Sequence, residues 1–581
     1  FGVDTNGHTT RASTEPIAAD VRPGKDGKAP ARLKLIAGLL DVGFDTLKQR
    51  EQQRRNRKWA LLAAASFAGM LLTGGLSVYA LRARSEAIAQ RGEAEGLIEF
   101  MLGDLRKKLE PVGRLDALDS VGERALKYYA AQDAGALDAD SLGRRARALH
   151  LIGEVDNTRG NLDHALEVFE EASHSTGELL SRAPNDGQRI FDHAQSVYWV
   201  GAVAFQRGQN DVAEKSFEEY KVLAERLVAI DPGKPEWQAE VGYAYTNLGT
   251  LLVKEGRSAE AAPAFERSLA ISSALAKATP DDAGLQLEEA QSRAWLADAR
   301  EKVGSFDAAR EQRMAELAIY ASVLATDANN NDARRGELVA RSALARLSAA
   351  KGRLPEALEQ LRIATTLADS LMKTEPDNTL WTDIGADVNA FYGEVAFRLT
   401  DPKLAGEAAA RSCTLAHDLV KRDASVVRWR GFHLSRCQSL QAALAAQAGN
   451  HAAALERSRE VVARIDALKP ADREGDQPIR WQLAAALLAI GDECRAMQRT
   501  DDAREAWGRV VAVLGPEQQR EDAAMQTILA TALLRLGRAD EAAPIVAKWE
   551  HAGYAHPDFI AIKTEYHAAT AADQRPSSPR H

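Results

Sequence analysis

Apolar residues recur along most of this chain with the spacing of amphipathic helices, and almost no segment shows the strict alternation of a strand. Within residues 139–565, small residues, glycines and a large apolar residue return about every 48 residues in a fixed order. The order is clearest in three successive units, with internal spacings of 7, 5 and 4 residues: Gly153, Gly160, Ala165 and Phe169; Gly201, Gly208, Ala213 and Phe217; and Gly249, Gly256, Ala261 and Phe265. We call these positions the repeat frame. Weaker copies continue to about residue 550, which predicts an array of about nine units.

Helix packing explains the residue types in the repeat frame. Two helices approach closely only where the crossing residue is small, which accounts for the first glycine and the alanine, while the phenylalanine fills the space beside them. The second glycine suits the left-handed end of a first helix. Asn161 and Asn210, soon after it, suit the start of a second helix. Each unit is therefore predicted to be a hairpin of two antiparallel helices.

The frame resembles the tetratricopeptide repeat, whose small-residue, glycine, alanine and aromatic pattern it follows over residues 139–550. Pro184, Pro232 and Pro280 match the proline that closes each unit of that family. The family period is about 34 residues, so about 14 more per unit here predict some two extra turns in each helix. The resemblance implies an all-α fold, a right-handed α-solenoid of antiparallel helix pairs. It also implies a protein or peptide partner on the concave face.

An uncharged stretch precedes the array. Residues 59–81, from Trp59 to Leu81, hold no charged side chain and follow a basic segment at residues 51–58. As a helix rising 1.5 Å per residue the stretch spans roughly 34 Å, enough for a hydrocarbon core of about 30 Å. This predicts a single transmembrane helix; the alternative is a buried core helix rich in alanine.

The basic residues near this stretch predict its orientation. Residues 40–58 contain six Lys or Arg, and residues 82–100 contain three. The N-terminal side is then cytoplasmic and the repeat array extracytoplasmic, in an inner (cytoplasmic) membrane. Within the stretch, small side chains recur every four residues, at Ala65, Gly69, Thr73 and Ser77. Such a line allows two spans to approach, which makes a homodimer possible.

The N-terminal residues 1–50 hold an amphipathic segment that starts near Ala31. The stretch from Glu15 to Asp20, a Gly-rich turn and the helix from Leu33 to Leu40 resemble the C-terminal end of bacterial TIR-type domains. That resemblance implies a cytoplasmic domain remnant, with the catalytic Glu by which some members cleave NAD lying upstream of Phe1. The alternative is an amphipathic juxtamembrane helix.

The remaining boundaries follow from pattern and composition. Residues 82–138 are predicted to be a stalk and a degenerate capping repeat, because terminal units lack one neighbour. Residues 566–581 end in a polar, Pro-containing tail that is predicted to be disordered.

Charge and cysteine content exclude some functions. The chain has 581 residues and a net charge of −9; residues 1–58 hold 12 Lys/Arg against 7 Asp/Glu, so the rest carries 62 against 76. An acidic array is a poor candidate for nucleic acid binding, so no nucleic acid partner is predicted. Cys413, Cys437 and Cys494 lack metal-ligand spacing, and we expect small buried residues with neither a zinc site nor a disulfide framework.

Catalytic motifs are not apparent in the sequence. No histidine pair has the spacing of a zinc protease helix, and no Gly-x-Ser-x-Gly elbow occurs. The pairs Glu170–Glu171 and Glu218–Glu219 are better explained by a solvated helix face than by acid–base catalysis. We therefore predict no catalytic, cofactor-binding or metal-binding residue, no cofactor, and no enzyme in the chain as given.

These observations predict a membrane-anchored interaction scaffold or sensor in a bacterial signalling or defence protein. The alternative is an array that regulates or oligomerises a TIR-type NAD-cleaving enzyme whose catalytic domain lies upstream. A passive assembly platform in the envelope is a third possibility.

Overall fold

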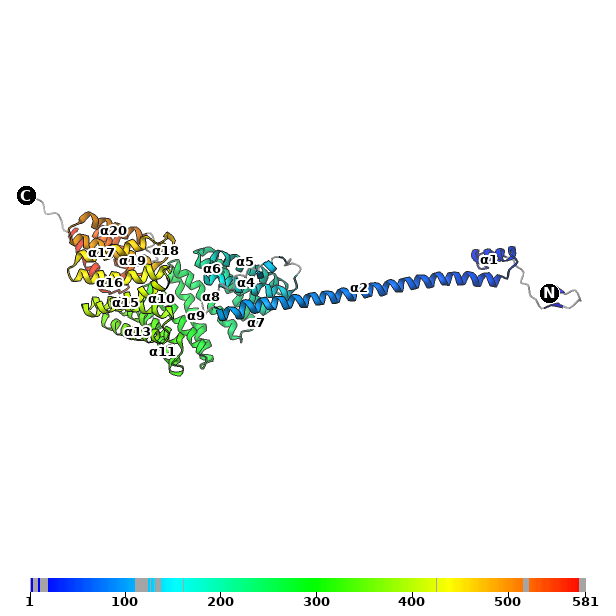
Figure 1. Cartoon of the computed structure of the whole chain (residues 1–581), viewed down its shortest axis with the longest axis horizontal. Coiled ribbons are helices and arrows are strands. Elements are labelled where there is room, and N and C mark those ends of the chain that lie inside the picture. The colour runs from blue at the N-terminus through cyan, green and yellow to red at the C-terminus, as the bar shows by residue number, and fades with distance from the viewer. Residues whose placement is uncertain are drawn as a thin grey trace, which may run out of the picture. The chain divides into compact units, whose positions relative to one another are not determined.

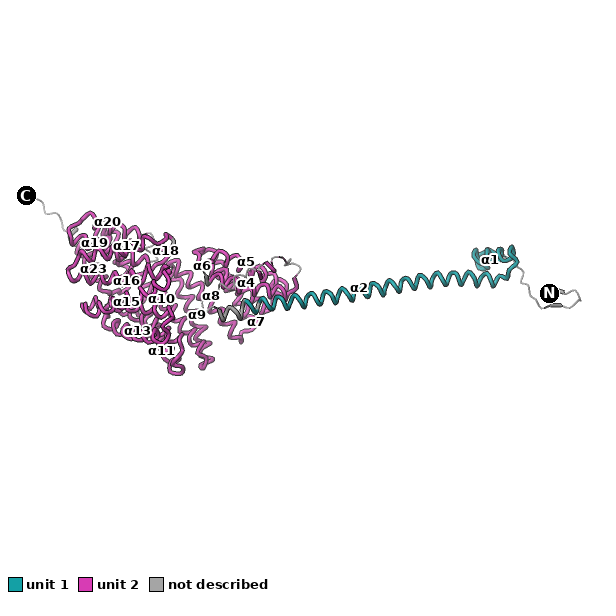
Figure 2. The backbone as a smooth tube through the Cα atoms, in the orientation of Figure 1, with its two compact units in different colours: residues 1–105 teal, residues 106–581 magenta. Residues whose placement is uncertain are grey.

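The computed structural model describes residues 2–3, 9–10, 19–109, 124–125, 127–129, 131, 137–159, 161–424, 426–515 and 522–573. The chain divides into two compact units, residues 1–105 and residues 106–581 (Figure 2). The frame residue Gly160, most of the predicted capping repeat and the end of the predicted tail lie outside the described residues.

The first unit is built on two helices. The short strands β1 (Gly2–Val3) and β2 (Thr9–Thr10) pair antiparallel, and α1 (Lys28–Leu39) is followed by α2 (Phe44–Leu109), a helix of 66 residues (Figure 1). Ala31 and Ala37 on α1 are buried. Within α2, by length and composition alone, the portion Phe44–Ile98 qualifies as able to cross a membrane, and its apolar window has a mean hydropathy of 1.8 with none of it buried.

The second unit consists of helices that pack in chain order. From residue 139 to residue 422 the structure describes twelve helices: α4 (Ala139–Arg159), α5 (Leu162–Arg182), α6 (Gly187–Gln206), α7 (Asn210–Ile230), α8 (Pro235–Lys254), α9 (Ser258–Ala278), α10 (Ala283–Lys302), α11 (Phe306–Thr326), α12 (Asn331–Ala350), α13 (Leu354–Thr374), α14 (Thr379–Arg398) and α15 (Pro402–Arg422). Each packs against the next one along the chain (Figure 1). The fold is therefore all-helical apart from the small N-terminal hairpin, within the residues that the structure describes.

The helix pairs keep a regular length. From α6 to α15 the first helix of each pair has 20 residues and the second has 21. The first helices α6, α8, α10, α12 and α14 start at residues 187, 235, 283, 331 and 379. These are two long helices per unit, joined by turns of three residues.

Side-chain caps are found at most of the first helices and at two of the second helices, where Asp401 caps α15 and Asn450 caps α17 (His451–Asp466). Asp186 accepts hydrogen bonds from the backbone of α6, as Asp282 and Asn330 do at α10 and α12. Asn161 and Asn210 lie at the starts of α5 and α7, as expected, but neither α5 nor α7 has a side-chain cap hydrogen bond.

The regularity decreases after residue 422. A π-turn, η4 (Trp429–His433), precedes α16 (Leu434–Gln447), and the chain continues through α17 (His451–Asp466), α18 (Pro470–Gly475), α19 (Gln477–Ala496), α20 (Thr500–Leu514), α21 (Ala523–Arg535), α22 (Ala539–His551) and α23 (Pro557–Asp573). Trp549 on α22 and Phe559 on α23 are fully buried in one hydrophobic cluster with Phe306 on α11 and Leu347 on α12. The last helices thus pack back onto units far earlier in the chain, a contact that a nearest-neighbour repeat pattern does not predict.

Candidate protein-binding surface

The first glycine of each clear unit lies against the phenylalanine of the same unit. A Cβ built on Gly249 would lie 2.7 Å from the ring of Phe265, closer than real Cβ atoms come to other atoms. The equivalent pairs are Gly153 with Phe169, at 2.7 Å, and Gly201 with Phe217, at 2.8 Å. The frame alanines are fully buried beside them: Ala165, Ala213 and Ala261. These residues bring the two helices of a pair together and so support the array's surface.

The second glycine of the frame ends the first helix in a left-handed conformation. Gly208 has φ of 75° and Gly256 has φ of 79°. The residue after Gly256 donates its backbone N–H to the carbonyl of Leu252 at 2.8 Å. Thr400 and Gln498 take the same conformation, with φ of 58° and 60°, where later units lack glycine. These short turns leave the first helices side by side, with one face of each free to line the array.

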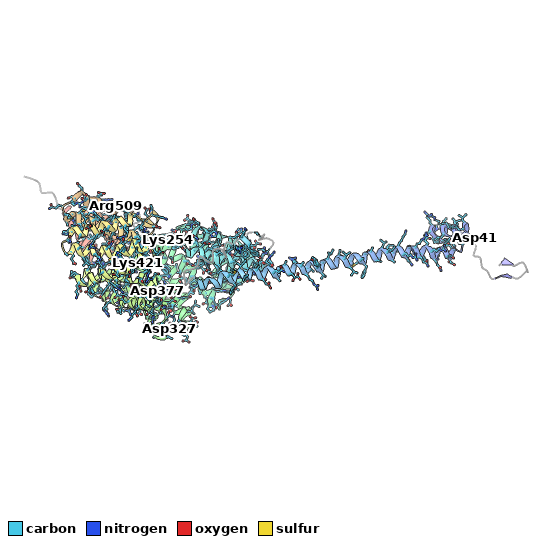
Figure 3. The ribbon with its side chains drawn as sticks, viewed as in Figure 1. Asp41, Lys254, Asp327, Asp377, Lys421 and Arg509 are labelled. Atoms are coloured by element: carbon cyan, nitrogen blue, oxygen red, sulfur yellow. A yellow bond between two sulfur atoms is a disulfide. The ribbon has the colours of Figure 1, made fainter. Side chains whose placement is uncertain are left out.

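Polar side chains connect neighbouring first helices along that face, which we call the first-helix face. Gln195 on α6 donates its side-chain amide to Glu240 on α8 at 2.7 Å, and the Tyr243 hydroxyl on α8 donates to Glu288 on α10 at 2.5 Å. The Nζ of Lys254 on α8 lies 4.0 Å from the ring centre of Phe205 on α6. Figure 3 labels Lys254 among the side chains of the chain. The contacts join consecutive units, while Tyr243 itself remains exposed to solvent.

Glu240 is a buried acid held by two donors. Tyr220 donates its hydroxyl to Glu240 at 2.5 Å, and Gln195 donates to the same oxygen. Burial raises the pKa of Glu240, and the two hydrogen bonds oppose that rise. Burial and the neighbouring Glu240 also raise the pKa of Tyr220. The group is a fixed hydrogen-bonded cluster.

A second polar cluster lies where η4 meets α14. Trp429 Nε1 and His433 Nε2 both contact Asp383 Oδ1, at 2.9 and 2.8 Å. Burial alone would raise the pKa of Asp383, but the contact with His433 brings it below the usual range. One turn further along, Arg436 pairs with Asp387 at 2.6 Å and with Glu394 at 2.7 Å.

The residues of these polar clusters were not predicted from the sequence. A signal was present, because the partners lie close to one repeat apart: Gln195 and Glu240 are separated by 45 residues, and Asp383 and His433 by 50. Polar pairs at that separation on first helices are what stacked units bring together.

The glutamate pairs on the second helices are exposed, as predicted for a solvated face. Glu171 pairs with Arg145 at 2.5 Å, and Glu219 lies 3.7 Å from His193. Glu170 and His193 line an open hollow of about 520 Å³ between α5 and α6. Among the residues that the structure describes, no group of three or more His, Cys, Asp or Glu could hold a metal ion.

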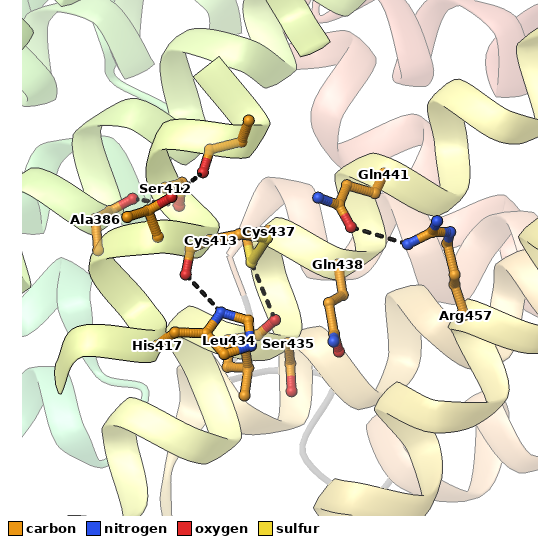
Figure 4. Close-up of a disulfide and its surroundings, with 12 residues drawn as sticks. Ala386, Ser412, Cys413, His417, Leu434, Ser435, Cys437, Gln438, Gln441 and Arg457 are labelled. Atoms are coloured by element: carbon orange, nitrogen blue, oxygen red, sulfur yellow. Dashed lines mark hydrogen bonds between the residues drawn. A yellow bond between two sulfur atoms is a disulfide. The ribbon is translucent and has the colours of Figure 1, made fainter. Parts of the chain in front are cut away.

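All three cysteines are buried, as expected, but the expectation of no disulfide was wrong for two of them. Cys413 on α15 and Cys437 on α16 form a disulfide, with Cα atoms 5.3 Å apart (Figure 4). Their separation of 24 residues is half a repeat unit, so the pairing follows from the packing of consecutive helices rather than from a sequence motif. Cys494 is free and buried, and burial raises the pKa of its thiol.

The small residues of the long helix lie on its exposed surface. Thr73 donates its hydroxyl to the carbonyl of Gly69 at 2.8 Å, and Ser77 donates to the carbonyl of Thr73 at 2.8 Å. Ala65 and Gly69 are exposed, and a Cβ at Gly69 would contact nothing within 4 Å.

Comparison with known proteins identifies one repeat. The profile of the tetratricopeptide repeat family matches residues 242–274, which cover most of α8 and most of α9 and include Gly249, Gly256, Ala261 and Phe265. The chain is thus a helical-repeat protein that contains a tetratricopeptide repeat. Among curated proteins, none matches the sequence.

Several solved structures share the helical architecture at low similarity. The Rap protein in complex with competence and sporulation factor is 10% identical over 74% of this chain and 99% of its own, with a TM-score of 0.40. Aspartyl phosphate phosphatase F from Bacillus subtilis is 9% identical over 72% and 93%, with a TM-score of 0.41. The quorum sensor NprR from B. thuringiensis is 12% identical over 74% and 99%, with a TM-score of 0.39. At this level the likeness carries no argument about function.

Proposed function

We propose that this chain is a membrane-anchored scaffold whose helical array binds a protein or peptide partner on its first-helix face, the concave side of a right-handed solenoid. The observation that carries the proposal is the tetratricopeptide match within an array whose first helices keep one register. In that register, Tyr243, Gln291 and Val339 are exposed at intervals of one unit. Stacked helix pairs commonly bind extended segments on such a face.

Three features support the anchor and its orientation. The apolar window of α2 is entirely exposed, whereas a core helix would bury it. Lys and Arg are more numerous on the N-terminal side of residues 59–81, which favours a cytoplasmic N-terminus. The Cys413–Cys437 disulfide favours an oxidising compartment for the array.

Two finer proposals concern the anchor's surroundings. Ala65, Gly69, Thr73 and Ser77 offer a face on which two spans pack as a homodimer. The resemblance of residues 1–50 to the end of a TIR-type domain supports a role in bacterial signalling or defence. It also leaves the alternative of an array that regulates an NAD-cleaving enzyme, which predicts NAD loss when the full-length protein is expressed.

Site-specific photo-crosslinking in living cells tests the binding face. A photo-reactive phenylalanine at Tyr243 or Gln291 should give the same discrete adduct, because both positions are exposed on first helices. Matched exposed positions on second helices, Ala270 on α9 and Ala318 on α11, should give none. If all four positions gave adducts of equal yield, the partner would not bind specifically on the first-helix face and the proposal would be wrong.

A topology reporter tests the orientation separately. Alkaline phosphatase fused after His581 should be active, because it folds only where disulfides form. The opposite test uses a C-terminal reporter that works only in the cytoplasm. If that reporter is active, the proposed orientation is wrong.

A further inference from the structure

Two turn glycines of the array are in contact with the C-terminal segment. A Cβ on Gly304 would lie 2.6 Å from Cβ of Ala552, and one on Gly352 would lie 2.9 Å from the carbonyl oxygen of Ala555. Three other glycines of the array with the same left-handed conformation have no neighbour within 4 Å: Gly208, Gly449 and Gly537. The turns after α10 and α12 therefore differ from the others in being covered by a close backbone.

The covering segment is the non-helical connection between α22 and α23. Its Ala555 donates a backbone N–H to the carbonyl of Ala350 at 2.7 Å, and Ala350 is the last residue of α12. The last carbonyls of a helix have no partner within the helix, so they are available to an incoming chain. The segment thus makes a main-chain contact of the kind that a bound peptide makes.

Aromatic side chains fix the segment on both sides. The ring of Tyr554 stacks on Phe306 at 5.6 Å between ring centres, and Trp549 lies 6.2 Å from the same ring. Phe306 is the first residue of α11, directly after the turn that contains Gly304. The aromatic pair therefore sits at the glycine turn itself.

A charge pair completes the contact. Arg398, the last residue of α14, donates to both carboxylate oxygens of Asp558, at 2.6 Å from Nη2 and 3.3 Å from Nε. These residues are 160 positions apart in the sequence. A two-point pair of this kind fixes both position and direction.

We propose that the edge formed by Gly304, Phe306, Ala350, Gly352 and Arg398 is a peptide-binding site. The chain's own residues 549–558, which we call the clasp, occupy it in the resting protein. A partner segment of the same chemistry, two aromatic residues followed by a carboxylate, binds there when the clasp opens. The site lies at the ends of the first helices and uses residues other than those of the first-helix face, so it is separate from the binding face proposed above.

A peptide with the sequence of residues 547–561, labelled with a fluorophore, tests the site on the full-length chain in detergent. The chain that carries Tyr554→Ala and Asp558→Ala has a weakened clasp and an intact edge. This variant should bind the peptide at least tenfold more tightly than the unmodified chain, because the internal segment no longer competes for the edge. Adding Arg398→Ala should reduce that binding at least tenfold, since the peptide's carboxylate loses its partner.

A glycine pair provides the matched control. Gly352→Val on the weakened-clasp background should abolish peptide binding, because its side chain would collide with the bound backbone. Gly208→Val imposes the same left-handed strain at a turn with open space around it, and it should leave binding unchanged. The proposed site would be wrong if both glycine substitutions reduced peptide binding equally. It would also be wrong if Arg398→Ala left peptide binding unchanged.

Hydrogen exchange on the unmodified chain tests the same idea without a destabilised variant. Excess peptide should increase exchange in residues 549–558 as it displaces them, and a peptide with Asp558→Asn should do so less. Unchanged exchange at saturating peptide would refute an exchangeable clasp and leave a permanent structural contact. The photo-crosslinking test at Gln291 does not depend on the clasp. A negative result in the peptide experiments therefore leaves the proposed first-helix face untouched.

Discussion

At the scale of the residue, glycine has two separate roles in the units that begin with α6 and α8, and its neighbours determine what a substitution costs. Position 249 requires a small residue because the ring of Phe265 lies against it. Position 256 favours glycine because its backbone is left-handed. The first role depends on packing and the second on conformation.

Gly249→Ala tests the packing role. The added Cβ would lie 2.7 Å from Phe265, so we expect a loss of about 1–3 kcal/mol in unfolding free energy through overpacking. Gly406 on α15 is the control, because a Cβ there meets nothing within 4 Å. Gly406→Ala should raise stability by roughly 0.5–1 kcal/mol, as alanine does in helices. Urea unfolding measures both, and equal effects would contradict the close approach.

Two buried histidines predict a loss of stability in acid. Burial lowers the pKa of His150 and of His556 to about 4 in each case. An unfolded histidine takes up a proton near pH 6.5, so between about pH 6.5 and 4 the unfolded chain binds more protons than the folded one. Stability is therefore complete above this window and falls as the pH decreases through it, on the order of 1–3 kcal/mol per histidine.

Urea unfolding at pH 7.5 and pH 5 measures this dependence. His150→Gln should flatten it in part, because glutamine keeps a polar group beside Ser196 without titrating. An unchanged slope in the variant would assign the acid sensitivity to other groups, such as the carboxyl of Asp558, whose pKa is lowered by Arg398 against the effect of burial.

At the scale of the element, consecutive helices are held by more than apolar packing. The Cys413–Cys437 disulfide joins α15 to α16 just before the helices lose their regular length. The adjoining η4 turn carries His433 and Trp429 onto Asp383 of α14. This junction is where a covalent bond and buried polar contacts supplement the repeat frame.

Removing the disulfide should destabilise this junction. Cys413→Ala with Cys437→Ala opens a loop of 24 residues, and we expect a loss of about 2–4 kcal/mol, from the chain-entropy model. Cys494→Ala, which removes a free thiol, should cost less. Thermal unfolding with and without a reductant measures the contribution of the disulfide to stability. If the reductant does not lower the unfolding temperature of the unmodified chain, the disulfide does not contribute as expected.

Charges placed in the long apolar helix test the membrane span. Leu71→Arg with Leu72→Arg puts two charges near the centre of residues 59–81, at a cost of about 2.5–3.5 kcal/mol each. The chain should then leave the membrane fraction on carbonate extraction. Leu39→Arg, at an exposed position on α1, is the control and should change nothing. Retention of the double variant in the membrane would argue against this span.

At the scale of the whole molecule, the second unit is not a simple array of neighbours. Trp549 and Tyr554 pack on Phe306, and Arg398 pairs with Asp558, so α22 and α23 stabilise helices in the middle of the chain. Stability in an ordinary solenoid is a sum over units and adjacent interfaces. Here a substitution at the C-terminus acts on distant units as well.

Trp549→Ala tests this coupling. Loss of a fully buried ring should cost about 3–5 kcal/mol and increase hydrogen exchange in α11 and α12 as well as in α22. Phe169→Ala, a comparable loss in the first unit, should increase exchange only in its neighbours α4 to α6. An increase confined to α21–α23 in the Trp549 variant would indicate independent units.

The helix pairs could be predicted because their contacts are local. Gly249 and Phe265 are 16 residues apart and meet within one hairpin, so small and large residues at fixed spacing contain the needed information. The polar pairs of the first-helix face were missed because each side chain looks like an ordinary surface residue until the next unit is stacked on it. The same holds for Cys413 and Cys437, whose spacing fits no known motif.

By itself, the sequence determined the all-helical class, the paired helices and the apolar stretch of α2, because helical periodicity and apolar length are properties of neighbouring residues. Only the tertiary structure decided that Cys413 meets Cys437, that His433 meets Asp383, and that the clasp packs on Phe306. These contacts depend on how many helices lie between the partners and on how each is rotated against the last. Small rotations between successive helices accumulate over many units. The total rotation cannot be predicted from any local sequence pattern.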